Sequence, residues 1–293
     1  MKIENYKIPT VPETIPHGDM PGDVIQINNE HITKASTIFP FLVDEINKFN
    51  QDKIVISVFG GSGVGKSEIA SVLSYFLNQN GINTYIMSGD NYPYRIPLYN
   101  DAERASIFRS EGLKALVDLN QYNNEIKDVL TKLWENEIDS DPKQIENYPF
   151  LREYQKGGRV GLKQYLGTEK EQDYNQVNNI IKKFKNNAEE IFFKRMGRSE
   201  DERFYDLIDT SKINVLIIEW THGGNKNIEG IDIPILLNST PQETKAHRLS
   251  RARDGKVDSA FTTMVLEIEQ EELDERRSSA KIVILKQGEI LDR

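Results

Sequence analysis

The stretch that decides the fold is Gly60-Gly61-Ser62-Gly63-Val64-Gly65-Lys66-Ser67. It fits the pattern G-x-x-x-x-G-K-[ST], in which the backbone N–H groups of a glycine-rich turn surround the phosphates of a nucleotide. Glycine suits such a turn because it adopts positive φ angles and has no side chain to keep the phosphates away. We therefore expect ATP against residues 61–67, with Lys66 on the β- and γ-phosphates and Ser67 on Mg²⁺.

The sequence on either side of this turn supports a nucleotide site. Residues 54–59 are a short, β-branched apolar run, which is typical of a buried strand in a parallel sheet. After the turn, apolar residues recur with helical spacing from Ile69 to Leu77, and Asn80-Gly81 ends the pattern. A strand, a glycine turn and a helix together direct a helix N-terminus at an anion. A glycine-rich turn without a ligand is the alternative interpretation.

Further apolar runs predict the rest of a parallel sheet. Strands alternate with helices along the chain, so we predict the α/β class: a parallel sheet of the phosphate-loop nucleotide-binding type, flanked by helices and joined by right-handed crossovers. The ligand site of such a sheet lies off the carboxyl ends of its strands. The runs are residues 82–87, 213–218, 233–237 and 281–285, and helices are predicted to start at 241 and to span 261–277.

The remaining segments fall outside this alternation. Residues 1–36 are predicted to be an extended, proline-rich arm followed by a hairpin at 23–33, and the arm lies on the surface or on a partner subunit, which leaves a homodimer open. Residues 37–293 form the nucleotide-binding domain, with 91–210 as a mostly helical insertion that binds substrate or forms a lid. Within it we predict helices at 101–119, 170–196 and 200–208, and a loop at 156–161.

Composition excludes several classes of protein. The chain has 293 residues, a net charge of −9 and no cysteine, and its four histidines are widely scattered. An acidic surface disfavours nucleic acid and anionic membranes as partners. Without cysteine there is no disulfide, thiolate catalysis or cysteine-based zinc site. No apolar run is long enough to span a membrane, so we expect a soluble, cytoplasmic protein.

Two carboxylates follow predicted strands at the same edge of the sheet as the glycine turn. Asp90 comes after the second strand, where it could accept a proton from a substrate hydroxyl or orient it. Glu219 ends the strand at 213–218, where an acid can hold Mg²⁺ through water. The alternatives are a turn-forming aspartate and a solvated acid at a strand end.

Cations are gathered near the C-terminus and in the insertion. Arg248, Arg251, Arg253 and Lys256 form a basic segment, of which Arg251 or Arg253 could close over the γ-phosphate; a solvated basic face is the alternative. His222 is interpreted as a surface histidine, with ligand contact as the alternative. For the acceptor pocket we select Asp90, Tyr92, Arg95 and Arg104.

These features together resemble the phosphoribulokinase/uridine kinase family of small-molecule kinases. The matching pieces are residues 60–67, Ser88-Gly89-Asp90, Ile217-Ile218-Glu219 and the segment from Arg248 to Lys256. The resemblance implies that Asp90 is the catalytic base, that Glu219 lies near Mg²⁺ and that the arginines belong to a lid. It covers about 53–100 and 213–285, and leaves 91–210 unassigned.

The resulting hypothesis is an ATP-dependent kinase acting on a hydroxyl of a nucleoside, sugar or sugar acid. Gly89-Asp90-Asn91 and the following Asp101-Ala102-Glu103-Arg104 are similar to the substrate loop of adenylylsulfate kinases, which is the second choice. A nucleotide hydrolase or switch is an alternative of another class, although the Asn-Lys-x-Asp signature of guanine specificity is missing at Asn225-Lys226. A non-catalytic nucleotide-binding scaffold is a third.

Overall fold

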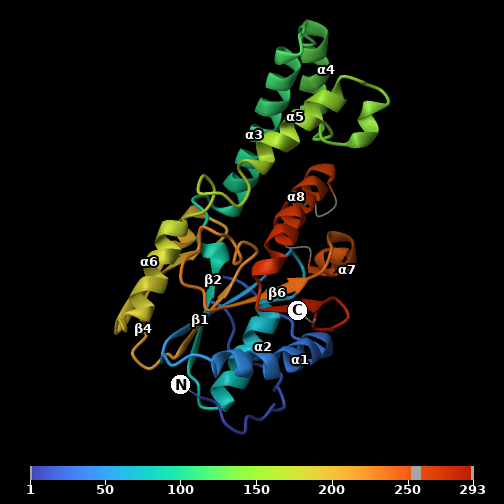
Figure 1. Ribbon diagram of the computed structural model, residues 1–293. Coiled ribbons are helices and arrows are strands. Elements are labelled where there is room, and N and C mark those ends of the chain that lie inside the picture. Colours follow the sequence, from blue (N-terminus) through green and yellow to red (C-terminus); the bar gives the residue numbers. More distant parts are fainter. Residues whose placement is uncertain (1, 252–258, 292–293) are drawn as a thin grey trace.

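A five-stranded parallel sheet forms the centre of the computed structural model, which describes residues 2–251 and 259–291. Its strand order is β2-β5-β1-β6-β7, so the strand that leads into the glycine turn is central (Figure 1). This confirms the predicted α/β class with a parallel sheet. The strands are β1 (Ile54–Gly60), β2 (Thr84–Ser88), β5 (Val215–Glu219), β6 (Ile233–Asn238) and β7 (Ile282–Leu285).

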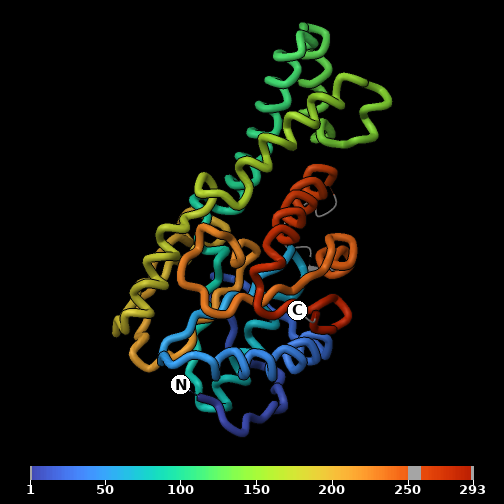
Figure 2. Tube along the Cα trace, viewed as in Figure 1, coloured from blue at the N-terminus to red at the C-terminus, as the bar shows by residue number. Residues whose placement is uncertain are grey.

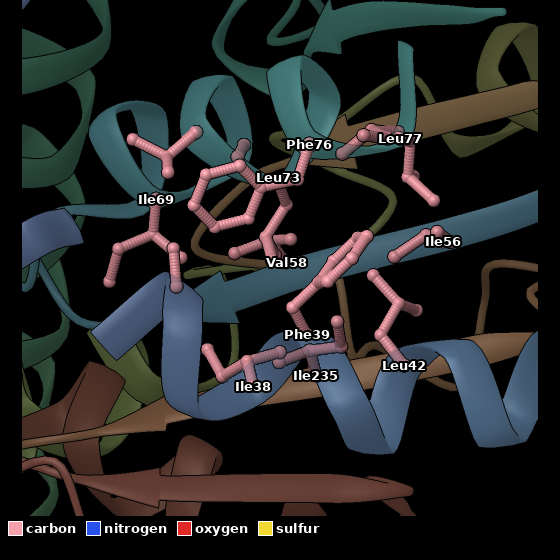
Figure 3. Packing of buried hydrophobic residues seen from close by; sticks show 14 of the residues in the cluster. Ile38, Phe39, Leu42, Ile56, Val58, Ile69, Leu73, Phe76, Leu77 and Ile235 are labelled. Carbon is pink, nitrogen blue, oxygen red and sulfur yellow. The ribbon is translucent and has the colours of Figure 1, made fainter. Parts of the chain in front are cut away.

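One face of the sheet is covered by α1 (Asn29–Ile46) and α2 (Lys66–Gln79). Every residue of β1 is buried, as its apolar sequence predicted, and Ile56 and Val58 point to this face. Phe39 of α1 packs edge-on against Phe76 of α2, with ring centroids 5.3 Å apart. Figure 3 shows the side chains of both helices meeting those of the strands in a continuous apolar layer.

The other face is covered by α6 (Tyr174–Lys185) and by a two-stranded antiparallel ribbon. The ribbon consists of β3 (Glu190–Met196) and β4 (Arg203–Asp209). Toward the C-terminus, α7 (Pro241–Arg251) follows β6, and α8 (Ala260–Arg276) precedes β7. Among the described residues, no helix is both long and apolar enough to cross a membrane.

Three helices of the predicted insertion form an arm that projects from the sheet, drawn in green in Figure 2. They are α3 (Pro97–Asp118), α4 (Asn124–Glu135) and α5 (Leu151–Lys163). The loop predicted at 156–161 is wrong, because these residues lie inside α5. Its glycines let α3 approach closely: a β-carbon on Gly158 would come 2.5 Å from the ring of Phe108. Short 3₁₀ turns lie at Gly89–Asn91, Pro142–Ile145, Glu200–Glu202 and Arg277–Ser279.

The hairpin predicted at 23–33 is also wrong. Asn28 instead caps α1, because its side chain accepts a hydrogen bond from the N–H of His31, while the His31 ring accepts one from the N–H of Asn28. The Asn28-Asn29 pair that suggested a turn is therefore a helix start.

Residues 170–208 contain less helix than predicted. The long helix expected at 170–196 stops at Lys185, where Asn187 adopts a left-handed conformation with a φ of 58°, and the chain continues as β3. In place of the helix expected at 200–208 there is a 3₁₀ turn at Glu200–Glu202 followed by β4. The prediction failed because Ile191 continues the helical spacing of Phe184 by chance, whereas Ile191 and Phe193 alternate as strand residues do.

Candidate active site

The glycine turn folds into a nest between β1 and α2. Gly60, Gly63 and Gly65 have φ angles of 155°, 76° and 91°, which other residues rarely adopt. Gly60 also needs its small size, since a β-carbon there would lie 2.5 Å from the carbonyl oxygen of Leu237 in β6. Lys66 begins α2, and its Nζ donates to the carbonyl oxygen of Gly61 at 3.1 Å. The backbone is thus shaped to receive an anion at a helix N-terminus.

Glu219 lies beside this nest at the end of β5. The parallel register places it opposite Val58 of β1 on one side and Ser88 of β2 on the other. Ser67 donates a hydrogen bond to its Oε2 at 3.1 Å, and Ser88 donates one to its Oε1. The side chain is buried, and this burial together with the charge of Asp90 raises the pKa of Glu219 to about 8.

Asp90 lies in the turn after β2 and is exposed. Because its charge raises the pKa of Glu219, the two carboxylates are in electrostatic reach of one another. Gly89 makes this arrangement possible, since a β-carbon there would overlap the indole of Trp220, which directly follows Glu219. The structure thus brings together the nest, Asp90 and Glu219, as the sequence predicted from the shared edge of parallel strands.

Sequence reasoning missed Asp19, which comes from the N-terminal arm. Its Oδ1 accepts from the backbone N–H of Ser88 at 2.8 Å and from the Asn91 amide at 2.9 Å. Its Oδ2 forms an ion pair with Arg195 at 2.8 Å. The N-terminal arm thereby anchors the end of β2 from which Asp90 projects. Only the acid itself was visible in the sequence, and nothing in its surroundings indicated a partner about 70 residues away.

Arg104 of α3 takes part in a separate buried network of hydrogen bonds and an ion pair. Its Nε pairs with Glu171 at 2.7 Å, and Glu171 also accepts hydrogen bonds from Asn100 and from the N–H of Gly167. Burial acts to raise the pKa of Glu171, but the charge of Arg104 and the hydrogen bonds from Gly167 and Arg104 hold it below its ordinary value.

His222 belongs to the same region and is not a surface residue as interpreted from the sequence. Its side chain is 4 % exposed and its ring packs edge-on against Trp220. Burial lowers its pKa to about 3. The ring is therefore neutral near pH 7.

The other predicted acceptor-site residues lie in different surroundings. Tyr92 is fully buried in the apolar cluster that contains Met87 and Trp220. Arg95 donates to the Tyr165 hydroxyl at 3.2 Å and lies 3.5 Å from Glu103. No hydrogen bond or ion pair joins either residue to the nest within the described part of the chain, and their substrate role stays a prediction.

The start of the basic segment lies over the nest. His247 of α7 forms a hydrogen bond with the carbonyl oxygen of Gly63 at 2.8 Å, and the Arg248 side chain covers Gly63. The side chain of Arg251 and all of Arg253 and Lys256 lie outside the described residues, so their lid role stays a prediction.

The residues beside the nest fit Mg²⁺ bound together with a nucleotide. Mg²⁺ usually keeps several waters and takes only one or two protein ligands beside the phosphates, and Ser67 and Glu219 supply one hydroxyl and one carboxylate. Among the described residues, no group of three or more histidine, aspartate or glutamate side chains is arranged to hold a metal ion alone. ATP phosphates would therefore complete the ligand set.

Two curated proteins are similar to this chain in sequence. No family model matches the sequence. Over 244 residues, 83 % of this chain, it is 34 % identical to the bifunctional alpha-galactosidase/sucrose kinase AgaSK of Mediterraneibacter gnavus, of which it covers 21 %. Over 74 residues, 25 % of this chain, it is 36 % identical to the adenylyl-sulfate kinase of Buchnera aphidicola subsp. Schizaphis graminum, of which it covers 34 %.

The chain thus spans about a fifth and a third of the length of these two relatives. Among solved structures, D-glycerate 3-kinase from Cryptococcus neoformans superposes with a TM-score of 0.49 at 11 % identity, covering 90 % of this chain and 98 % of that one. Both curated relatives carry kinase names, in agreement with the resemblance that the motifs indicated.

Proposed function

We propose that this protein is an ATP-dependent kinase that transfers the γ-phosphate to a hydroxyl group of a small metabolite. The observation that carries the proposal is the meeting of Lys66, Glu219 and Asp90 at the carboxyl ends of β1, β5 and β2. A nest for phosphates, a metal-holding acid and a second, exposed acid are the parts that phosphoryl transfer needs.

Each residue has a defined task in this proposal. The amides of residues 61–67 and Lys66 would hold the β- and γ-phosphates. Ser67 and Glu219 would hold Mg²⁺, which when bound would neutralise charge on those phosphates. Asp90 accepts the proton of the acceptor hydroxyl. As this happens, the hydroxyl oxygen bonds to the γ-phosphorus, and the bond between the γ-phosphorus and the departing ADP breaks. Arg251 or Arg253 would close over the γ-phosphate. Positioning and electrostatics supply most of the rate.

A sugar is the acceptor class that we propose to test first. The relative matched over 83 % of this chain is named a sucrose kinase. Because 244 of the 293 residues are matched, that similarity includes more than half of 91–210. This segment supplies Glu171 and the helical arm formed by α3, α4 and α5. It is also where an acceptor pocket was predicted. The match to an adenylyl-sulfate kinase covers only 74 residues.

The experiment is a screen for acceptor-dependent release of ADP. The purified chain is incubated with Mg-ATP and sucrose, other sugars, sugar acids, nucleosides, amino acids or adenylyl sulfate, and the product is identified by phosphorus NMR. We expect ADP and a sugar phosphate with a neutral sugar. Loss of ATP that is equal with and without every acceptor would support a hydrolase, and no ADP under any condition would support a binding scaffold.

A further inference from the structure

We propose that Glu269, His222 and Arg276 bind the hydroxyl groups of the acceptor and that they select a neutral acceptor over an anionic one. The inference rests on the proposed kinase function and deepens it. These residues belong to a group that we name the acceptor-side cluster: Arg104, Glu171, His222, Glu269, Glu272 and Arg276.

The cluster is assembled from separate parts of the fold around one point. Glu269, Glu272 and Arg276 lie on α8, and His222 lies in the loop after β5. His222 and Glu272 meet at Gly167: a β-carbon there would lie 2.7 Å from His222 Nδ1 and 2.9 Å from Glu272 Oε2. A side chain at 167 would fill the space that the two groups share.

The cluster adjoins residues 60–67, the glycine turn that forms the nest and that we call the phosphate loop from here on. Glu269 lines a small pocket together with Gly61 and Ser62 of the nest. The charge of Lys66 acts on both Glu269 and His222, lowering the pKa of each. His222 also comes only three residues after Glu219. A molecule held by the cluster is therefore beside the phosphates that Lys66 would hold.

The arginines of the cluster are already neutralised. Arg104 pairs with Glu171, and Arg276 pairs with Glu272, each at 2.7 Å. The fifth charge is Glu269, for which no ion pair or hydrogen bond exists within 2–251 and 259–291. The neutral His222 adds no positive charge. No cation of the cluster is left to balance a carboxylate or phosphate on the acceptor, and the ionised form of Glu269 repels either one.

Three polar groups in the cluster are left to bind a ligand. Glu269 is half-buried, its carboxylate has no hydrogen-bonding partner among the described residues, and this burial raises its pKa to about 7. His222 Nδ1 and Arg276 Nη1 are buried without a hydrogen bond in the same part of the chain. Buried polar atoms are nearly always paired, because an unpaired one is costly. Hydroxyl groups suit all three protein groups, since a hydroxyl can both donate and accept a hydrogen bond.

The test compares Glu269→Gln with wild type and with Glu275→Gln, which removes an exposed carboxylate from the same helix. We expect Glu269→Gln to raise the KM for sucrose, or for the best neutral sugar of the screen, by about tenfold to a hundredfold. The KM for ATP should stay within about twofold. The wild type should have a higher kcat/KM for glucose than for gluconate, and Glu269→Gln should lower the ratio of these two kcat/KM values. Glu275→Gln should match wild type in all three measurements.

Glu269→Asp provides a second variant that keeps the charge. It should raise the sugar KM while retaining the preference against gluconate, and circular dichroism melting verifies that each variant is folded. An unchanged sugar KM in Glu269→Gln, or a wild type that prefers gluconate, would overturn this inference and leave the kinase proposal standing. A wild type that phosphorylates no acceptor would overturn the kinase proposal and this inference together.

Discussion

The phosphate loop and the acceptor-side cluster flank the same point but are built in different ways. The loop is one continuous stretch of eight residues, and its shape is set by three glycines with positive φ. The cluster draws one side chain each from α3, the segment after α5 and the loop after β5, and three from α8. Phosphates are common to all nucleotides and can be bound by backbone amides, whereas an acceptor must be recognised by side chains. The local part is therefore visible in a sequence, and the assembled part is not.

The largest effect in this comparison is expected at Asp90. Asp90→Asn removes the proposed proton acceptor, so turnover should fall by about 10³- to 10⁴-fold while nucleotide affinity stays the same. Because Asp90 is exposed, the fold should be unaffected. Steady-state kinetics and ATP titration calorimetry measure the two quantities, with Asp118→Asn on the arm as a control. Turnover retained in Asp90→Asn would remove Asp90 from the mechanism.

Removal of the lysine in the nest comes next. Lys66→Ala should lower turnover by about 10²- to 10³-fold, since it deletes a charge aimed at the transferring phosphate. The only hydrogen bond that the structure gives its Nζ, among described residues, goes to the adjacent Gly61 carbonyl, so the melting temperature should barely change. If Lys66→Ala kept the turnover of the wild type, the glycine turn would not be part of the reaction.

On the acceptor side, loss of a buried ion pair should be seen first as loss of stability. Arg104→Met leaves the fully buried Glu171 without its cation, and we expect the free energy of unfolding to fall by about 3 kcal/mol. Arg159→Met is the matched control, because Arg159 pairs with Glu267 and Glu271 at the surface and should cost less than about 1 kcal/mol. Urea denaturation compares them, and equal losses would mean that Glu171 does not depend on Arg104.

The smallest effect is expected away from both sides of the site. Phe192 of β3 is 56 % exposed and lies opposite Leu207 of β4. Phe192→Thr keeps a residue that favours strands, so the unfolding free energy should change by about 0.5 kcal/mol and the kinetics should not change. A large loss of stability or activity would show that this face of the ribbon is covered in the working protein.

The sequence by itself determined the central sheet, the phosphate loop and the strand-end positions of Asp90 and Glu219. These rest on local signals, and parallel strands necessarily end at one edge. Only the tertiary structure decided that the glycines of α5 lie in a helix, since their role depends on the facing α3. It also decided that β3 and β4 pair and that Asp19 anchors β2. Contacts between distant residues leave no local pattern, and the acceptor side consists of such contacts.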